Sequence, residues 1–375
     1  MKILLNISRI IVGVLFIFSG LVKANDPLGL SYKMQEFFQV WGWQGLNSLT
    51  LAFSVIMISF EIIAGVAVLL GWRMKLFSWL LLLLIIFFTF LTGYAVFSGK
   101  IKECGCFGDC IPLTAMQSFL KDLLLSLLIG FIFIFKDRIV PVMSMRNSFL
   151  VLFFTTIFSI ALQWFVLVHL PLVDCLPYKK GSSIPENLKV PAGAIPDSSV
   201  ISFVYEVDGK QKEFTADKFP EDFDEARYKF IKRYDKLIRK GNAETAIKDF
   251  TLQTVYGNDT TQAILDKPGY SLLLFVQNDY KKGPWTETLE SVMTLASRKK
   301  VEGFLVTNIS IEALRADRPE AFTVLTPLLC DATAIKTAAR ANPTLYLLKQ
   351  GIIINKWSYA DLDRALLQIQ QLPAP

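Results

Sequence analysis

Long apolar stretches dominate the first half of the chain and stop near its middle. Five of them have roughly the 20 residues that an α-helix needs to cross a bilayer. They run from Ile3 to Val22, from Leu49 to Leu70, from Leu76 to Phe97, from Phe119 to Phe135 and from Phe149 to Leu170. Each is predicted to be a transmembrane helix, including the first, which is too long for the apolar core of a signal peptide.

The second half begins with short segments of mixed polarity. Residues 178–199 are rich in Pro, Gly and Ser, which indicates a linker. A hairpin is predicted at residues 200–216, because Asp208-Gly209 between alternating segments favours a tight turn. A helix is predicted from Glu221 to Arg239, because its larger apolar residues approximate one helical face.

From residue 247 onward the pattern alternates between strands and helices. The continuously apolar segment Tyr270–Val276 is predicted to be a central strand that is buried on both faces. Further strands are predicted at residues 303–307, 344–348 and 352–357, and helices at residues 285–298, 332–340 and 361–370. This order is typical of an α/β domain.

Composition supports a mixed fold class, in which an α-helical membrane bundle precedes a soluble α/β domain. The chain has 375 residues and is 53% hydrophobic, and the apolar excess lies before Pro171. We therefore divide it into a four-helix membrane domain (1–140), a fifth transmembrane helix (141–177), a linker with hairpin and helix (178–246) and an α/β domain (247–375). The net charge of +6 comes from scattered Lys and Arg, so the lipid bilayer, and not nucleic acid, is the expected partner.

Basic residues predict the orientation in the membrane. They collect before the first helix, between the second and third, and between the fourth and fifth, as Lys2, Arg73, Lys75, Lys136, Arg138 and Arg146. By the positive-inside rule this side, with the N-terminus, is cytoplasmic. The α/β domain is then extracytoplasmic, which in a bacterial inner membrane means periplasmic.

Four charged residues lie inside the predicted spans, namely Arg9, Glu61, Lys121 and Asp122. Charge inside a membrane is unfavourable and usually faces the bundle interior with a partner. One interpretation is a polar site that binds a quinone or carries a proton, formed by Glu61, Lys121 and Asp122. The other is a structural ion pair or a snorkelling side chain.

Three cysteines, Cys104, Cys106 and Cys110, lie within seven residues of the loop between the third and fourth helices. They are candidate redox thiols, because thiol exchange needs an attacking thiolate, a second thiol nearby and access. The alternative is a structural disulfide, either between Cys106 and Cys110 or between Cys175 and any of the three. A metal site would need a fourth ligand, and the sole histidine, His169, is a poor candidate, so none is predicted.

The membrane half resembles a known family. The segment from Ser8 to Lys23 is similar to the first helix of the DoxX family, and Glu61 followed by Gly65 and Gly71 fits its second helix. The loop from Cys104 to Cys110 resembles that of the MauE branch, which has a Cys-x-Cys-Phe-Gly core.

Over residues 1–140 this resemblance implies a four-helix membrane bundle linked to thiol or quinone redox. It gives Cys104, Cys106 and Cys110 the thiol role. The methylamine-utilisation members are associated with the maturation of a disulfide-rich periplasmic enzyme, which implies a periplasmic or envelope protein as partner.

Residues 247–375 resemble the TlpA-like group of thioredoxin folds. The segment 249–252 is similar to that group's first strand, and Pro343 stands where the group has a cis-proline. The group's dithiol belongs in the stretch 277–285, which here contains no cysteine. The resemblance therefore implies a domain without two-cysteine exchange, in which Cys330 is a buried free thiol or forms a mixed disulfide with the membrane loop.

Two hypotheses follow, and whether the protein is an enzyme stays open. In the first, an inner-membrane protein of the DoxX/MauE type takes part in periplasmic thiol or quinone redox through the loop Cys104–Cys110, and its thioredoxin-like domain docks a partner. In the second, the protein is a non-enzymatic subunit or scaffold of an envelope complex with structural cysteines. A small-solute transporter is disfavoured, because the five spans contain no evident repeat.

Overall fold

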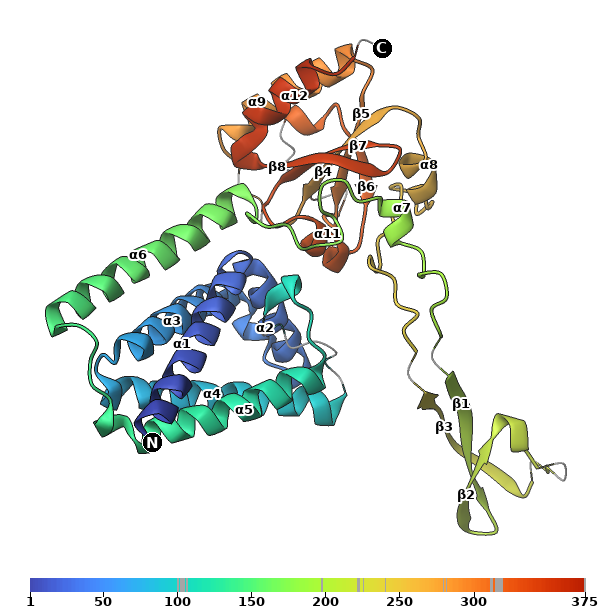
Figure 1. The fold of residues 1–375 in the computed structure, drawn as a ribbon. Helices are drawn as coiled ribbons and strands as arrows, with labels where there is room; N and C mark the ends of the chain where they lie inside the picture. The colour runs from blue at the N-terminus through green and yellow to red at the C-terminus, as the bar shows by residue number, and fades with distance from the viewer. Residues whose placement is uncertain are drawn as a thin grey trace.

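The computed structural model describes the chain apart from residues 100, 102–104, 106, 197, 221, 222, 225, 240, 279, 281, 311, 312, 314–319, 374 and 375, and the side chains of 236, 237 and 321. Figure 1 shows a bundle of long helices, a mixed α/β domain against one end of the bundle, and a small β arm that projects from that domain.

Within the described residues, five helices are long and apolar enough to cross a membrane, which confirms the five predicted spans. They are α1 (Lys2–Ala24), α3 (Thr50–Leu70), α4 (Met74–Ser98), α5 (Ala115–Ile134) and α6 (Met145–His169). Helix α1 packs on α3, and α4 packs on α5. The backbones of α1 and α3 come so close that a Cβ on Gly65 would lie 2.8 Å from the carbonyl oxygen of Gly13. Small residues allow such close packing in membranes.

The loop between α1 and α3 contains a helix that the hydrophobic pattern did not predict. Helix α2 (Pro27–Trp41) starts at the N-cap Asp26 and ends at Gly42, which has a left-handed φ of 75°. An Asp-Pro start and a Gly end are standard helix-boundary signals, and they were available in the sequence. A short 3-10 helix, η1 (Gln44–Leu49), leads from α2 into α3.

The N-terminus and the two basic links meet at one end of the bundle. Val142 N donates to Leu70 O at 2.9 Å, and Arg138 Nη1 lies 3.5 Å from Met1 Sδ. The basic residues therefore share one end, as predicted, and the α/β domain lies at the opposite end (Figure 1). That the basic end is cytoplasmic stays a prediction.

The α/β domain is built on a five-stranded sheet with the order β6-β5-β4-β7-β8. The strands are β4 (Tyr270–Val276), β5 (Glu302–Thr307), β6 (Thr326–Leu329), β7 (Thr344–Lys349) and β8 (Ile352–Ser358). Strands β4, β5 and β6 run parallel, and β7 and β8 pair antiparallel. The peptide bond between Asn342 and Pro343 is cis.

Helices cover both faces of this sheet. Helices α9 (Trp285–Arg298) and α12 (Leu362–Gln370) pack on one face, and α11 (Ala332–Ala338), with the short α7 (Ile184–Asn187) and α8 (Thr261–Leu265), packs on the other. Residues 271–276 of β4 are all buried, which confirms burial on both faces.

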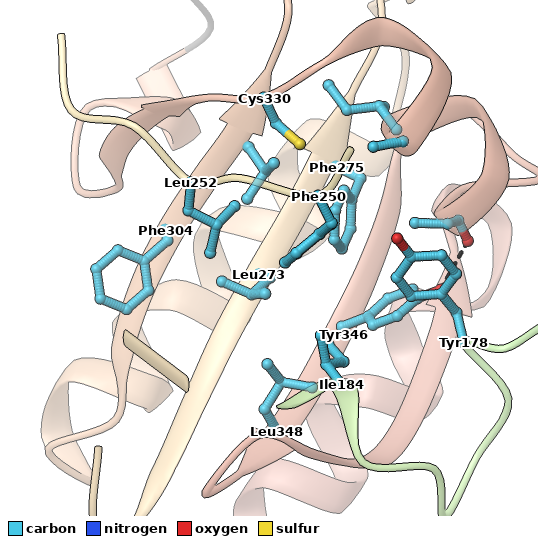
Figure 2. Packing of buried hydrophobic residues seen from close by; sticks show 14 of the residues in the cluster. Tyr178, Ile184, Phe250, Leu252, Leu273, Phe275, Phe304, Cys330, Tyr346 and Leu348 are labelled. Atoms are coloured by element: carbon cyan, nitrogen blue, oxygen red, sulfur yellow. Dashed lines mark hydrogen bonds between the residues drawn. The ribbon is translucent and has the colours of Figure 1, made fainter. Parts of the chain in front are cut away.

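Two segments differ from their predictions. The hydrophobic core on the α11 side of the sheet is called the second core below. Tyr178 and Ile184, from the predicted linker, lie in it with Phe250 and Leu252 (Figure 2). The backbone of residues 181–184 bonds to β8 and its turn, so this Pro- and Gly-rich segment belongs to the domain. The segment 249–252 does not form a strand, and β6, which was not predicted, occupies the edge of the sheet beside β5.

The arm is a three-stranded antiparallel sheet with the order β2-β1-β3. Strands β1 (Ser198–Val207) and β2 (Lys210–Thr215) confirm the hairpin, but β3 (Tyr228–Arg239) shows that the helix predicted over 221–239 was wrong. Strand β3 pairs along the whole of β1. The Tyr205 ring lies 5.5 to 6.4 Å from five other aromatic rings, and such cross-strand pairing outweighs weak helical periodicity.

Tyr205→Ala is expected to destabilise the arm by about 3 kcal/mol, because it removes the ring that contacts five other aromatic rings of the arm. Hydrogen exchange of the β1 and β3 amides should accelerate, while exchange in the bundle stays unchanged. Ile238→Ala is the control, since this side chain is 65% exposed. Equal exchange in both variants would contradict the role given to the cluster.

Candidate functional site

A cavity of about 420 Å³ lies inside the bundle among α1, α2, α3, α4 and α5. Most of its wall is apolar, with many Phe residues and Trp41 from α2. Its polar side chains are Ser19, Lys23, Lys33, Glu61, Thr92, Lys121 and Asp122. The structure thus brings Glu61, Lys121 and Asp122, the residues singled out from the sequence, to one cavity.

Glu61 has a partner that sequence analysis missed. Lys23 Nζ lies 2.5 Å from Glu61 Oε1, and Ser19 Oγ donates to Glu61 Oε2 at 3.3 Å. The side chains of Lys23 and Glu61 are 4% and 2% exposed. The sequence reading ended the first helix at Val22, whereas α1 extends to Ala24 and keeps Lys23 on the face that carries Ser19 one turn earlier. Pairing makes the burial of both charges tolerable.

Asp122 forms the second charged group of the cavity. Thr92 Oγ1 donates to Asp122 Oδ2 at 3.1 Å, and Lys121 Nζ lies 2.9 Å from Asp122 Oδ1. The Lys121 ammonium also lies 5.0 Å from the centre of the Phe107 ring, in the cysteine loop. This ring therefore connects the loop to the charged wall of the cavity.

The cysteine loop borders the cavity. Gly105 and Phe107 line it, and a Cβ on Gly105 would lie 3.2 Å from Lys33 Cγ. Gly105 also has a left-handed φ of 67°, so a side chain there would be strained as well as crowded. Cys104 and Cys106, on either side of Gly105, lie outside the described residues.

The other three cysteines have defined states. Cys110, at the end of the 3-10 helix η2 (Gly108–Cys110), forms a disulfide with Cys175 just beyond α6. This is one of the pairings that the sequence left open. Cys330 is free and buried in the second core, and burial raises the pKa of its thiol to about 12.

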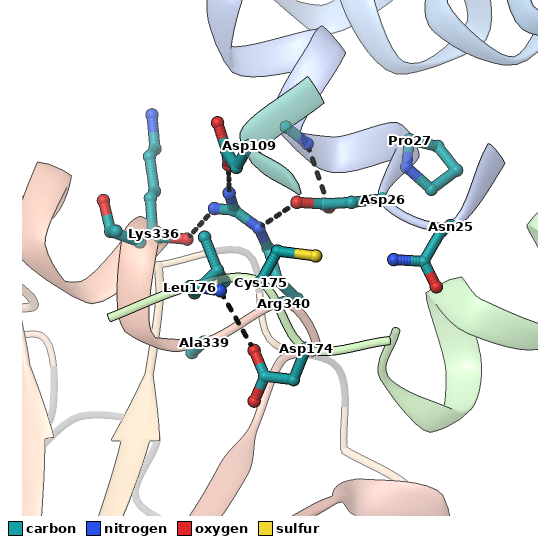
Figure 3. Close-up of polar contacts among 12 residues, drawn as sticks. Asn25, Asp26, Pro27, Asp109, Asp174, Cys175, Leu176, Lys336, Ala339 and Arg340 are labelled. Atoms are coloured by element: carbon teal, nitrogen blue, oxygen red, sulfur yellow. Dashed lines mark hydrogen bonds and ion pairs between the residues drawn. The ribbon is translucent and has the colours of Figure 1, made fainter. Parts of the chain in front are cut away.

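An ion-pair cluster that sequence analysis missed joins the α/β domain to the bundle beside this disulfide (Figure 3). Arg340 Nε donates to Asp26 Oδ2 at 2.8 Å, and Arg340 Nη2 donates to Asp109 Oδ2 at 2.8 Å. Arg340 Nη1 donates to Lys336 O at 2.6 Å, so each of the three guanidinium nitrogens makes a hydrogen bond. Asp26 also accepts from Gly29 N, which caps α2.

Burial and charge act in opposite directions within this cluster. Burial raises the pKa of Asp26, and Arg340 offsets only part of the rise. Burial by itself would lower the pKa of Arg340, but the Asp26 and Asp109 carboxylates outweigh it and raise that pKa overall. The guanidinium therefore stays charged, and its attraction to both carboxylates holds the joint.

Further polar contacts extend the joint along α2 and the exit of α6. Asn25 exchanges two hydrogen bonds with the backbone of Val173, at 2.8 and 2.9 Å. Lys336 Nζ donates to Gln35 Oε1 at 3.2 Å, and His169 Nδ1 lies 3.0 Å from Asp361 Oδ2. The domain is thus fixed to the end of the bundle where the cysteine loop lies.

These features define a helical membrane protein with a charged site in an apolar cavity beside a cysteine loop. Residues 1–135 match the family model of the Methylamine utilisation protein MauE. Residues 199–240, which form the arm, match a domain of unknown function (DUF8463). Residues 1–135 of this membrane protein are therefore MauE-like, and the match ends before α6.

One relative is similar over part of its length. Over 155 residues the chain is 26% identical to a protein named Protein TlpB from Flavobacterium psychrophilum. The aligned part is 40% of this chain and 41% of that protein. No solved structure matches the chain.

Arg340→Met is expected to weaken domain docking by about 3–5 kcal/mol, because Asp26 and Asp109 lose their buried counter-charge. Amide exchange in α2 and α11 should rise. The matched control is the triple variant Arg340→Met/Asp26→Asn/Asp109→Asn, which carries no lone charge and keeps a good N-cap at position 26. It should recover most of the protection, and unchanged exchange in Arg340→Met alone would contradict the role of the cluster.

Cys330 is expected to resist alkylation in the folded protein. A thiol pKa near 12 lowers the thiolate population at pH 8 by about 1,000-fold relative to an exposed cysteine. Iodoacetamide labelling followed by peptide mass spectrometry should modify Cys330 only after unfolding in denaturant, and labelling should rise with pH. Rapid native labelling at pH 8 would show that this thiol is accessible.

Proposed function

We propose that this protein is a redox protein of the bacterial inner membrane that couples a thiol pair in the cysteine loop to a quinone in the bundle cavity. The observation that carries the proposal is the cavity itself. It combines an aromatic wall with Glu61, Lys121 and Asp122, and it reaches Gly105, the residue between Cys104 and Cys106. An apolar pocket with a few convergent polar groups is typical of a small-molecule site.

The proposed step conserves atoms and electrons. The Cys104 and Cys106 thiols lose two electrons and two protons as one sulfur–sulfur bond forms. The quinone takes up the two electrons and two protons and becomes a quinol. The reverse direction uses the same groups, so the reduction potentials of the loop and the quinone decide the direction.

Lysines of the cavity have two roles in this proposal. Lys23, held by Glu61, supplies a hydrogen-bond donor to a quinone oxygen as negative charge develops there. The aliphatic carbons of Lys33 lie beside Gly105, and the Lys33 ammonium at the end of this side chain pairs with Glu36 at 3.2 Å. A cation next to the loop favours the thiolate, which is the nucleophilic form of cysteine.

The Cys110–Cys175 disulfide has a structural role in this proposal, which leaves Cys104 and Cys106 as the redox thiols. It attaches the loop to the chain that leaves α6. We assign the α/β domain to the thioredoxin-like folds, which the order and directions of its strands β4, β5, β7 and β8 support. Because residues 277–285 contain no cysteine, the domain acts by docking, first on its own bundle and then on an envelope protein.

The proposed location follows from charge. The end of the bundle with Arg73, Lys75, Lys136 and Arg138 faces the cytoplasm, so the cysteine loop and the α/β domain face the periplasm. That compartment is oxidising, so accessible thiols that stay reduced there indicate a redox role.

The test is anaerobic oxidation of the reduced protein in detergent by a short-chain ubiquinone. We expect one quinol per oxidised Cys104/Cys106 pair, measured by quinone absorbance and by thiol mapping. Cys106→Ser should abolish the reaction, and Cys330→Ser is the matched control that should not change it. The double variant Lys23→Met/Glu61→Gln, which leaves no lone buried charge, should slow oxidation by about 100-fold.

A wild-type loop whose thiols do not react with the quinone would overturn this proposal. If its cysteines are then found locked in bridges that resist reduction, the scaffold function takes its place. The Cys110–Cys175 disulfide and the missing dithiol in the α/β domain are the observations that favour that second function.

A further inference from the structure

The β arm stands apart from both the bundle and the α/β domain (Figure 1). Two extended segments connect it to the domain, and they are joined to each other near the arm. Asn242 N donates to Ile195 O at 2.8 Å, and Ile195 N donates to Asn242 Oδ1 at 2.7 Å. A Cβ on Gly241 would lie 2.0 Å from Ile195 O, so only glycine allows this approach. These bonds hold the two connecting segments together near the base of the arm.

Among the described residues both outer edges of the arm are open, and the edge of β3 is the longer one. Strand β1 is central, with β2 on one side and β3 on the other, so among the described residues no strand pairs with the outer edge of β3. Strand β3 has 12 residues, twice the 6 of β2. An exposed edge of this length presents a row of backbone donors and acceptors on which another extended chain can pair.

The charged residues of β3 determine which kind of strand can pair with its outer edge. The sequence of the strand contains five basic residues, Lys229, Lys232, Arg233, Lys236 and Arg239, but only one acidic residue, Asp235. Two β3 edges would place like charges opposite each other, which disfavours a second copy of the chain. An acidic strand would instead form cross-strand pairs of opposite charge.

Exposed apolar side chains supply further contact area on the same strand. Phe230 is 59% exposed, Tyr234 is 38% exposed and Ile238 is 65% exposed. They are interspersed with the basic residues, so an incoming strand would meet both charge and apolar surface. This combination differs from a purely charged edge, which serves only to prevent association.

We propose that the outer edge of β3 is a docking site for an acidic, extended segment of a partner protein, which adds to the arm as a fourth strand. An anionic membrane surface is the competing ligand, since it also attracts lysine and arginine. It offers no regular backbone partners for the unpaired edge, whereas an added strand satisfies the row of donors and acceptors. The strand is therefore favoured.

The test uses the full-length protein in detergent and a fluorescent peptide of alternating Glu and Val, about as long as β3. Fluorescence anisotropy should show saturable binding. An analogue with N-methyl groups on alternate residues keeps every side chain but cannot form a ladder, and it should not bind. The double reversal Lys232→Glu/Arg233→Glu should weaken binding by about tenfold or more.

Charge exchange provides the control for folding. The reversed variant should gain affinity for the matching Lys-Val peptide, a result that an unfolded arm would not give. The proposal is overturned if the N-methylated peptide binds as tightly as its parent, or if affinity does not follow the exchanged charges. It is also overturned if the peptide does not bind. Binding of the arm to vesicles of anionic lipid would then identify the membrane surface as the ligand.

Discussion

The arrangement of the molecule depends on the buried guanidinium of Arg340. This group is 5% exposed, and its charge is tolerable only while the Asp26 and Asp109 carboxylates lie beside it. The two acids come from different loops at one end of the bundle. Docking of the α/β domain therefore requires that Asp26 caps helix α2 and that the cysteine loop brings Asp109 to the same point.

The covalent and ionic constraints act on neighbouring residues. Asp109 binds the α/β domain, and Cys110 is bonded to Cys175, where the chain leaves α6. The loop is thus fixed at its C-terminal end by two different bonds, while Gly105 and Phe107 border the cavity. Movement of the domain relative to the bundle would consequently shift the loop residues that line the cavity.

The sequence predicts those elements whose signal is local and strong. The five spans, the buried strand Tyr270–Val276 and the helix Trp285–Arg298 follow from apolar runs or clear periodicity, and the structure has them. Strand β3 was mistaken for a helix because its apolar residues fit both periods, and only pairing with β1 decides between them. Helix α2 was missed although its Asp26-Pro27 start is a boundary signal.

The site could be predicted only in part, for a related reason. A charged residue within a membrane span usually has a partner, so Glu61 and Asp122 can be identified as candidate site residues from the sequence. The identity of the residue that forms the ion pair depends on how the helices pack. Lys23 lies 38 positions from Glu61, and Arg340 lies 314 positions from Asp26, and no spacing rule connects such pairs.

The docking contact also bears on where thiol chemistry takes place. Asn342, beside Pro343, accepts a hydrogen bond from Gln277 N at 3.0 Å, so the stretch where a thioredoxin-like domain would carry its dithiol lies next to the docking residue Arg340. On the proposed assignment, the domain holds the membrane half with residues next to the position at which such folds carry a dithiol. A dithiol there would compete with docking, whereas thiols in the loop beneath the domain would be positioned by it.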